Sequence, residues 1–452
     1  MLTTQIKKLS HTKPIVLLLH PVVIFTLYRL ALDLSYRYLM SPFFGSEGFT
    51  YSFHFWKWLG LLSLSILVYF AVTDRQDSPS SIFLELLMWM CYAPFACFYA
   101  LSGRNITFYV YMSICFVCIK LILILPWHRV WSAFDRLIGL IIPLYRRHQD
   151  KLKLLLFWLI LGICLLLSFL TIAALVFNTK TLNFAAALSL RIYEIRQDTS
   201  LPLWASYLVT WQSKTVNIFM LCILFRHKRY WLMVFPILLQ LAIYVSLGNR
   251  VDLFALALCL FVFFAFRAKR SRSILGGVHF IGVCGLSLFM FVSRHGVIPY
   301  SLFRRTYFTQ AAISSNYYTF FSNHVKLSFS EGRLGRLIGL AYPYPTYSTK
   351  LMMANFSGSM NGGANGFFLS SGFADMGFAG MLIVCVFLSI ILVIVDRICE
   401  RIPLWFSMTV LAVSVFSLMN SSLFTSLGTH GMLLSILLLL LYGIYPFKRH
   451  DG

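Results

Sequence analysis

Residues 376–395 read MGFAGMLIVCVFLSIILVIV, a run that contains no charged side chain. A helix needs about twenty predominantly apolar residues to cross the hydrocarbon of a bilayer, so this run predicts a transmembrane helix. The rest of the chain has the same character, because 59% of its 452 residues are apolar and only 12% are charged. So few charges cannot cover the surface of a soluble core of this size. The sequence therefore predicts an integral membrane protein.

Further apolar stretches of similar length occur along the whole chain. Together with the first one they give about twelve predicted spans, near 15–38, 54–73, 82–101, 106–126, 153–177, 203–224, 230–248, 251–267, 274–292, 376–395, 403–419 and 425–446. Only helices and closed barrels satisfy every backbone polar group in lipid, and barrel strands alternate apolar with polar residues. These runs do not alternate in that way. The predicted fold is an all-α polytopic bundle.

Positive charge is unevenly distributed between the predicted spans. The 38 Lys and Arg residues outnumber the 15 Asp and Glu residues and give a net charge of +23. Basic clusters occupy every second connection: Lys7/Lys8/Lys13, Arg129 to Lys153, Arg226/Lys228/Arg229, Arg267/Lys269/Arg270/Arg272, Arg397/Arg401 and Lys448/Arg449. Cytoplasmic loops carry such an excess, so we expect both termini in the cytoplasm. Topology accounts for the charge, and we expect no nucleic-acid partner.

The predicted spans divide the chain into three parts. Residues 1–292 hold about nine spans, and within them residues 127–152 predict an amphipathic helix along the inner membrane interface. Residues 293–375 form one large external loop, and residues 376–452 hold the last transmembrane helices. Long connections in compact proteins are usually functional. We therefore expect the functional site on the outer side of the membrane.

Arginines outside the membrane are the first candidate site residues, because the positive-inside rule disfavours them there. Arg250 follows Asn249 at the outer junction of two predicted spans. The start of the next helix adds free backbone N–H groups beside the guanidinium, which favours an anion. The alternative is that Arg250 pairs with Asp252 or extends to the lipid headgroups.

A second group of candidates lies in the outer connection at 178–202. It consists of Arg191, Tyr193, Glu194 and Arg196. In a helix, Arg191 lies on one face with Ile195, and Glu194 with Asp198, because each pair is four positions apart, so this connection predicts a short amphipathic segment. A surface helix whose charges pair with one another remains the alternative.

A third group opens the large external loop. Arg304 and Arg305 are followed by Tyr307 and then by Tyr317 and Tyr318. Arginine binds phosphate oxygens in a bidentate fork, while a tyrosine ring packs on an apolar surface and its hydroxyl forms hydrogen bonds. A glycan phosphate would satisfy both residue types. The alternative for the aromatic residues is the belt at the level of the lipid headgroups.

Asn365 lies in a glycine-rich stretch, 361–366, just before the last spans. Its amide could bind sugar hydroxyls, and the glycines from Gly372 to Gly380 fit a turn and close helix packing. The alternative is that helix-end chemistry alone explains this stretch.

Four residues are candidates for a general base at neutral pH: His295, His324, Glu194 and Glu331. The external residues contain no Asp-x-Asp pair or His/carboxylate cluster that would hold a divalent metal. Cys115 and Cys118 lie in an apolar setting, so we assign them no metal or redox role. We expect no metal and no cofactor.

The order of these features resembles the Wzy family of O-antigen or capsular repeat-unit polymerases. The resemblance covers most of the chain and rests on topology and on short motifs: Tyr193 to Arg196, Gly248 to Arg250, Arg304 with Arg305, and Asn365 with Gly372 to Gly380. It implies a GT-C-like fold, similar to the polytopic inverting glycosyltransferases. Asn249 departs from the family, because many relatives carry Ser or Thr at that place.

The resemblance also implies an activity. Undecaprenyl-pyrophosphate-linked oligosaccharides would be joined at the periplasmic face of a bacterial inner membrane, without a metal. Arg250, Arg196, Arg304 and Arg305 would hold the pyrophosphate of the lipid carrier. A co-polymerase that regulates chain length is the implied protein partner.

Two other activities fit the same sequence features. An O-antigen ligase uses a similar donor and transfers it to lipid A-core instead of to another repeat unit. A flippase would move the lipid-linked glycan without chemistry, and it should carry paired charges in mid-membrane. Arg29, Asp33, Lys57, Glu85 and Lys120 lie inside or near spans. The large external loop favours an enzyme.

Overall fold

The structure is a computed structural model that describes residues 20–73, 78–127, 131, 149–178, 201–267, 271–293, 302–358 and 363–444. All regular elements among these residues are helices. Seven of the helices are long and apolar enough to cross a membrane. The chain is thus an all-helical membrane protein over the part that the structure describes, which confirms the general fold class expected from the sequence.

The first part of the chain holds helices that alternate with short π-helical or 3₁₀ turns. In order they are α3 (Pro21–Ser35), η1 (Tyr36–Met40), α4 (Ser41–Phe44), η2 (Gly45–Glu47), α5 (Phe55–Val72), α6 (Pro79–Leu87), η3 (Met88–Tyr92), α7 (Ala93–Leu101), α8 (Thr107–Leu123), α11 (Gln149–Asn178), α14 (Leu203–Trp211), η4 (Gln212–Val216) and α15 (Asn217–Arg226). In α6–α7 and α14–α15 the π-turn leaves the helix continuous.

The second part contains the remaining bundle helices and the helices of the predicted external loop. They are η5 (Tyr230–Met233), α16 (Val234–Leu247), α17 (Arg250–Ala265), α18 (Ser271–Val292), η6 (Arg304–Phe308), α20 (Thr309–Asn323), α21 (Arg333–Leu337), α22 (Ser348–Ser357), α23 (Phe368–Cys399), α24 (Leu404–Met419), α25 (Leu423–Gly428) and α26 (Met432–Ile444). The loop predicted at 293–375 is therefore largely helical where it is described.

Each of the twelve apolar stretches contains a helix, but the helices differ in length. The seven long ones are Phe55–Val72, Pro79–Leu101, Trp158–Asn178, Leu203–Arg226, Tyr230–Leu247, Ser273–Val292 and Phe368–Cys399. Four shorter apolar helices are Thr107–Leu123, Val251–Ala265, Leu404–Met419 and Met432–Gly443. At 1.5 Å per residue these four fall short of a hydrocarbon layer of about 30 Å. Twelve membrane crossings stay a prediction.

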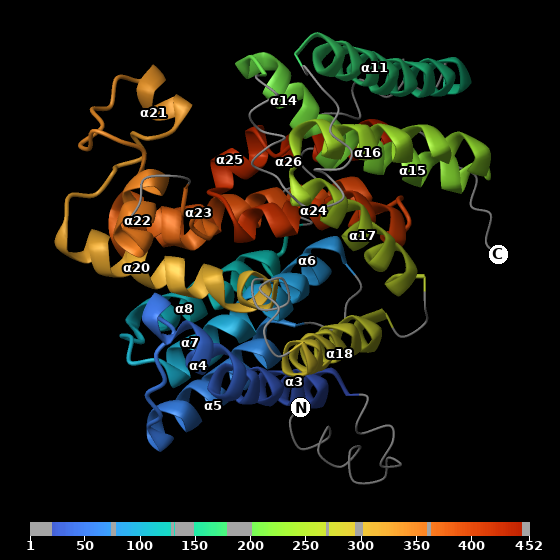
Figure 1. Cartoon of the computed structure of the whole chain (residues 1–452). Helices are drawn as coiled ribbons and strands as arrows, with labels where there is room; N and C mark the ends of the chain where they lie inside the picture. The colour runs from blue at the N-terminus through green and yellow to red at the C-terminus, as the bar shows by residue number, and fades with distance from the viewer. Residues whose placement is uncertain are drawn as a thin grey trace.

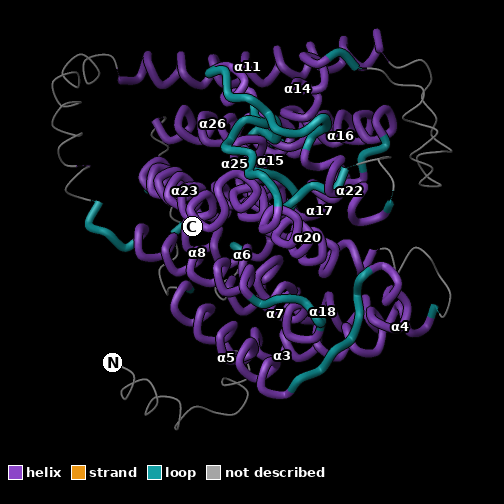
Figure 2. Tube along the Cα trace, turned by 90° about the vertical axis from the view of Figure 1, so that its left-hand side faces the viewer, coloured by secondary structure: helices purple, strands orange, loops and turns teal. Residues whose placement is uncertain are grey.

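The bundle helices run side by side in layers. In Figure 1, α3, α5, α7 and α18 form the lower part, α11 and α14 to α16 form the upper part, and α23, α24 and α26 lie between them. The closest pairs are α23 with α8, α18 with α3, and α17 with α24. Figure 2, seen from the left-hand side of Figure 1, shows many of these helices close to end-on.

The centre of the lower part is the continuous helix Pro79–Leu101, whose side chains are nearly all buried. A helix that is apolar on all sides belongs in the interior of a bundle. The ring of Trp89 packs against Phe25, Tyr69 and His279, with centroids 5.2, 5.6 and 5.8 Å away.

One end of the bundle carries the described basic connections. Arg267, just after α17, lies over the ring of Phe225 at 5.1 Å, and Trp405 at the start of α24 packs on Phe225 and Phe263. We call this the basic end. Helices α20, α21 and α22 of the large loop gather on the left-hand side in Figure 1. We call that side the loop end.

Helix α23 contains a sharp break. Met376 and Gly377 have non-helical backbone angles, and Gly377 has a φ of +64°. A Cβ atom on Gly380 would lie 2.1 Å from the carbonyl oxygen of Gly372, so only glycine fits this close approach. The helix begins at Phe368, eight residues before the predicted span at 376, and its first part belongs to the wall of a cavity.

Candidate functional site

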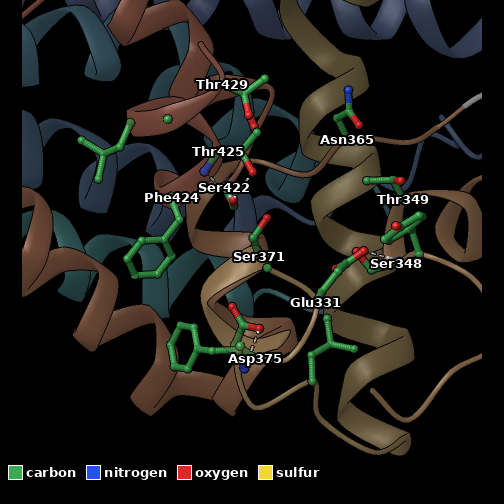
Figure 3. Close-up of a pocket in the computed structure, with 18 of the residues that line it drawn as sticks. Glu331, Ser348, Thr349, Asn365, Ser371, Asp375, Ser422, Phe424, Thr425 and Thr429 are labelled. Carbon is green, nitrogen blue, oxygen red and sulfur yellow. Dashed lines mark hydrogen bonds between the residues drawn. The ribbon is translucent and has the colours of Figure 1, made fainter. Parts of the chain in front are cut away.

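A cavity of about 1180 Å³ lies at the loop end of the bundle. Its walls come from α14, from residues 327–349 of the large loop, from the first part of α23 and from α25. Figure 3 shows the labelled polar side chains of these elements around one common space. The volume falls above the usual range for small-molecule sites, about 300–1,000 Å³, so it has room for an oligosaccharide segment.

Asp375 is the half-buried carboxylate on the α23 side of this cavity, and its oxygens face the open space (Figure 3). Its Oδ1 accepts a hydrogen bond of 3.1 Å from the backbone N–H of Phe329, the one side-chain bond that Asp375 forms with described residues. A carboxylate that is positioned by one donor and otherwise open can accept a proton from a substrate hydroxyl.

The segment that positions Asp375 also closes the broken end of the helix. The N–H groups of Leu327 and Ser328 donate to the carbonyl oxygens of Ala374 and Asp375, each at 2.9 Å. The backbone leaves helical geometry at Met376 and Gly377, directly after these carbonyls, and the last carbonyls of a helical segment take partners from outside it. Ser328 and Phe329 both have positive φ angles, 52° and 59°, although neither is glycine. Such strained residues cluster at ligand-binding and catalytic sites.

Glu331 is a second carboxylate on the cavity wall. Its Oε1 accepts a hydrogen bond of 2.7 Å from the N–H of Ser348, the first residue of α22. A negative charge at a helix N-terminus stabilises the helix, so this carboxylate has a structural task. Exposed Arg336 lines the same cavity. The cavity therefore contains two carboxylates in different environments. That of Glu331 is hydrogen-bonded to the start of α22, whereas that of Asp375 is open to the cavity.

Polar and aromatic groups complete the lining. Tyr317 donates from its hydroxyl to the carbonyl oxygen of Ala364 at 3.3 Å, and burial raises the pKa of Tyr317, so the hydroxyl stays protonated. Asn365 and Ser371 offer an amide and a hydroxyl. Aromatic rings come from α14, the loop and α25, namely Trp204, Tyr207, Trp211, Tyr347 and Phe424. Apolar faces next to hydrogen-bonding groups suit a sugar ring.

Three of the residues singled out from the sequence line the cavity: Tyr317, Asn365 and Glu331. Asn249 precedes α17 and Arg250 is its first residue, near the turn made by Gly248 at a φ of +63°.

Five candidates fall outside the described residues, and they are Arg191, Tyr193, Glu194, Arg196 and His295. Of the predicted amphipathic helix at 127–152, the structure describes Trp127, Trp131 and residues 149–152.

The arginine pair of the large loop does not line the cavity. Arg304, in η6, forms an ion pair with Glu47 of η2, and its guanidinium lies 4.6 Å from the ring centre of Phe44. Arg305 is exposed in the same turn. Glu47 compensates the charge of Arg304, so this arginine does not need a phosphate to neutralise it.

The remaining candidates pack against other side chains. Tyr307 is only 9% exposed and packs on Phe303 and Phe308. Tyr318 packs on Phe108 and Phe373. His324 stacks on the ring of Phe320 at 4.0 Å, and its Nδ1 lies 2.8 Å from that residue's carbonyl oxygen. None of the three lines the cavity.

Sequence reasoning missed Asp375 as a site residue and missed the aromatic wall formed by α14. Asp375 stands directly before an uncharged run, where it resembles an ordinary charged flank of a span. The signal available in the sequence was that acidic residues are rare, because the chain has only 15 of them. Trp204, Tyr207 and Trp211 recur with helical spacing, which is equally typical of a lipid-facing or core stripe.

Among the described residues no group of three His, Cys, Asp or Glu side chains is arranged to hold a metal ion. The sequence matches no protein-family model, and neither curated proteins nor solved structures give a match.

Proposed function

We propose that this protein is a membrane glycosyltransferase that joins oligosaccharides carried on polyprenyl pyrophosphate, as O-antigen or capsular repeat-unit polymerases do. The observation that carries the proposal is the loop-end cavity, where the open carboxylate of Asp375 faces hydroxyl, amide and aromatic groups. The resemblance of the sequence motifs to that family supplies the substrate class. Such a cavity beside apolar helices suits a substrate that is part sugar and part lipid.

The proposed reaction needs one proton acceptor and one site for a leaving anion. A hydroxyl oxygen of the acceptor glycan attacks the anomeric carbon of the donor, and the bond from that carbon to the pyrophosphate oxygen breaks. The pyrophosphate leaves with the electron pair, and the configuration inverts. Asp375 takes the hydroxyl proton on its carboxylate. Pyrophosphate is a capable leaving group, so the protein mainly positions both glycans and stabilises the departing charge.

Arg250 is the arginine that we assign to the leaving pyrophosphate. Its bidentate fork matches phosphate oxygens, and its place at the start of α17 combines it with the positive end of that helix. The pairing of Arg304 with Glu47 weighs against a direct role for Arg304. Arg196 stays a predicted pyrophosphate ligand from the resemblance alone.

The membrane orientation belongs to the same proposal. Arg226, Arg229 and Arg267 mark the basic end, which the positive-inside rule assigns to the cytoplasm. The cavity at the opposite, loop end would then face the periplasm of a bacterial inner membrane. Repeat units on their lipid carrier are joined on that side in the family that the sequence resembles.

A direct test is reconstitution of the purified protein in liposomes with undecaprenyl-pyrophosphate-linked repeat units and no energy source. We expect glycans of two and more repeats on the carrier lipid, detected by gel and mass spectrometry. Liposomes without protein provide the control. Lipid-linked units that change leaflet but never lengthen would overturn the proposal and favour the flippase alternative.

Gene deletion separates the polymerase from the ligase. Loss of a polymerase leaves lipid A-core that carries one repeat, whereas loss of a ligase leaves bare core and polymer on the carrier lipid. We expect the first pattern in the deletion strain, and a chain-length-regulating co-polymerase would then be the partner to seek. Bare core with accumulated polymer would reassign the protein as a ligase.

A further inference from the structure

A lysine and a histidine from distant parts of the chain meet beside the cavity. Nζ of Lys214 lies 2.7 Å from Nδ1 of His430, and the two residues are 216 positions apart. Lys214 belongs to the π-turn η4, and His430 to the connection between α25 and α26. π-Turns inside α-helices are frequent at functional sites, because the extra residue redirects a side chain.

Side-chain hydrogen bonds to backbone carbonyls hold the contact in place on both sides of the pair. Trp211, before Lys214, donates from Nε1 to the carbonyl oxygen of Gly428 at 2.8 Å. Thr215, after Lys214, donates from Oγ1 to the carbonyl oxygen of Gly431 at 3.1 Å. Gly431 has a φ of +80°, and a Cβ there would lie 2.5 Å from Oγ1 of Thr215. The geometry of the Lys214–His430 pair is therefore fixed.

The Lys214–His430 pair carries a positive charge, and the positions of its hydrogen-bond donors are fixed. A lysine ammonium only donates hydrogen bonds, so Nδ1 of His430 accepts and the ring proton stays on Nε2. A ring that accepts on Nδ1 carries its proton on Nε2 alone, so His430 is neutral in this contact. The pair thus carries one positive charge and presents N–H groups from both side chains.

A buried network runs from Gln212, two residues before Lys214, to the start of α17. Nε2 of Gln212 donates to Asn217 at 2.8 Å, and Nδ2 of Asn217 donates to Gln240 at 2.7 Å. Nε2 of Gln240 donates to the backbone carbonyl of Asp252 at 2.8 Å. The carboxylate of Asp252 is buried in the first turn of α17 and its negative charge acts on Lys214. Lys214 is therefore brought close to the turn that carries Arg250.

Neither member of the pair lines the cavity, but neighbouring residues of both do. Trp211 and Thr429 line the cavity, and Lys214 and His430 follow them closely in the chain. Both members of the pair retain some solvent exposure. A cation at this place therefore lies near the cavity and close to the apolar helices α14 and α26.

We propose that Lys214, oriented by His430, binds the phosphate groups of an isoprenoid pyrophosphate at the edge of the cavity. This inference rests on the proposed function, since it names the residues that hold the lipid carrier of that reaction. A lysine whose hydrogen-bonded partner is a neutral ring keeps donors for an anion, and the charge of the nearby Asp252 carboxylate offsets only part of its own. Lys214 would act with Arg250, and His430 is a positioning residue.

The test measures binding directly and does not depend on turnover. Farnesyl pyrophosphate is titrated onto the purified full-length protein in detergent, and the thermal unfolding midpoint is followed. Farnesol and inorganic pyrophosphate are run as separate arms. We expect farnesyl pyrophosphate to raise the midpoint of the native protein and of the control variant Lys350→Met, which changes an exposed lysine on α22.

In Lys214→Met we expect at least a tenfold loss of affinity for farnesyl pyrophosphate, and in Lys214→Arg we expect most of the affinity to remain. His430→Phe, which removes the acceptor for Lys214, should give an intermediate loss. Retention of the Lys214→Arg response shows that the position tolerates substitution without unfolding. An equal response of the native protein and Lys214→Met, or no response of the native protein, would overturn this assignment.

The two proposals fail in different experiments. If Lys214→Met binds farnesyl pyrophosphate normally while the native protein lengthens lipid-linked glycans, the glycosyltransferase proposal stands and the lysine site is wrong. If the native protein binds the pyrophosphate through Lys214 but never lengthens glycans, the anion site stands and the reaction is wrong.

Discussion

Two regions at the loop end of the bundle contain the same kinds of residues and use them differently. In η6, Arg304 is paired with Glu47 and Tyr307 is packed among phenylalanines. In the cavity, Asp375 has a single backbone donor and faces open space. The comparison shows that a charged residue near a membrane surface is a candidate site residue when the fold leaves its charge without an ion-pair partner or with few hydrogen bonds. Substitutions of Asp375 and Arg304 test that difference, and a fully buried ion pair in α3 extends it to the interior of the bundle.

The largest effect is expected from Asp375→Asn. The amide has the size of the carboxylate and can still accept from the N–H of Phe329, but it cannot take a proton. General-base catalysis contributes typically 10²–10⁴-fold, so the rate of glycan lengthening in liposomes should fall by about that factor. The unfolding midpoint should stay within a few degrees of the native value. A variant that retains more than a tenth of the native rate would remove Asp375 as the base.

A large effect on stability, instead of activity, is expected from Arg29→Met. Arg29 is fully buried in α3 and paired with Asp33, which also accepts from Nε1 of Trp58 at 2.9 Å. Removal of one partner of a buried ion pair costs about 3–5 kcal/mol, because the other charge stays buried without compensation. Denaturant titration in detergent measures this loss.

The matched control for this pair is the double variant Arg29→Met, Asp33→Leu, which removes both charges. We expect it to recover much of the lost stability, since an apolar pair of similar volume avoids the desolvation penalty. A single variant as stable as the native protein would show that the pair is not needed. If the double variant were less stable than the single one, Asp33 would have a role beyond neutralising Arg29.

The smallest effect is expected from Arg304→Gln. The side chain of Arg304 is 21% exposed and that of Glu47 is 46% exposed. Ion pairs this open to solvent contribute about 0–1 kcal/mol. The unfolding free energy and the rate of glycan lengthening should both change little, the rate by less than about fivefold. A loss as large as that of Asp375→Asn would return Arg304 to the site, in the role that the family resemblance implies.

The positions of the helices could be predicted from the sequence, whereas their breaks could not. A run such as 230–248 predicts its helix because apolar length is a local property, and the structure has a helix at Tyr230–Leu247. The glycines from Gly372 to Gly380 indicated a turn and close packing, but the break at Met376 and Gly377 inside one helix was not predicted, since it depends on residues 327–329 reaching the carbonyls there. The π-turn η4 was not predicted either, and it contacts the distant α25–α26 connection through Thr215.

The candidate site divides in the same way. Tyr317, Asn365 and Glu331 could be found from the sequence, because they lie in a large loop whose length already pointed to function. Asp375 could not be identified as a site residue from the sequence, since the residues next to it in the chain indicate only the start of an apolar span.

The sequence by itself determined that the chain is helical and enters a membrane, because too few charges exist to cover it in water and because a crossing needs only a local run of apolar residues. Only the tertiary structure decided which polar groups meet. Arg304 finds Glu47 from 257 positions away, and Lys214 finds His430 from 216. Such contacts depend on how whole helices pack against one another, a property that no local pattern contains.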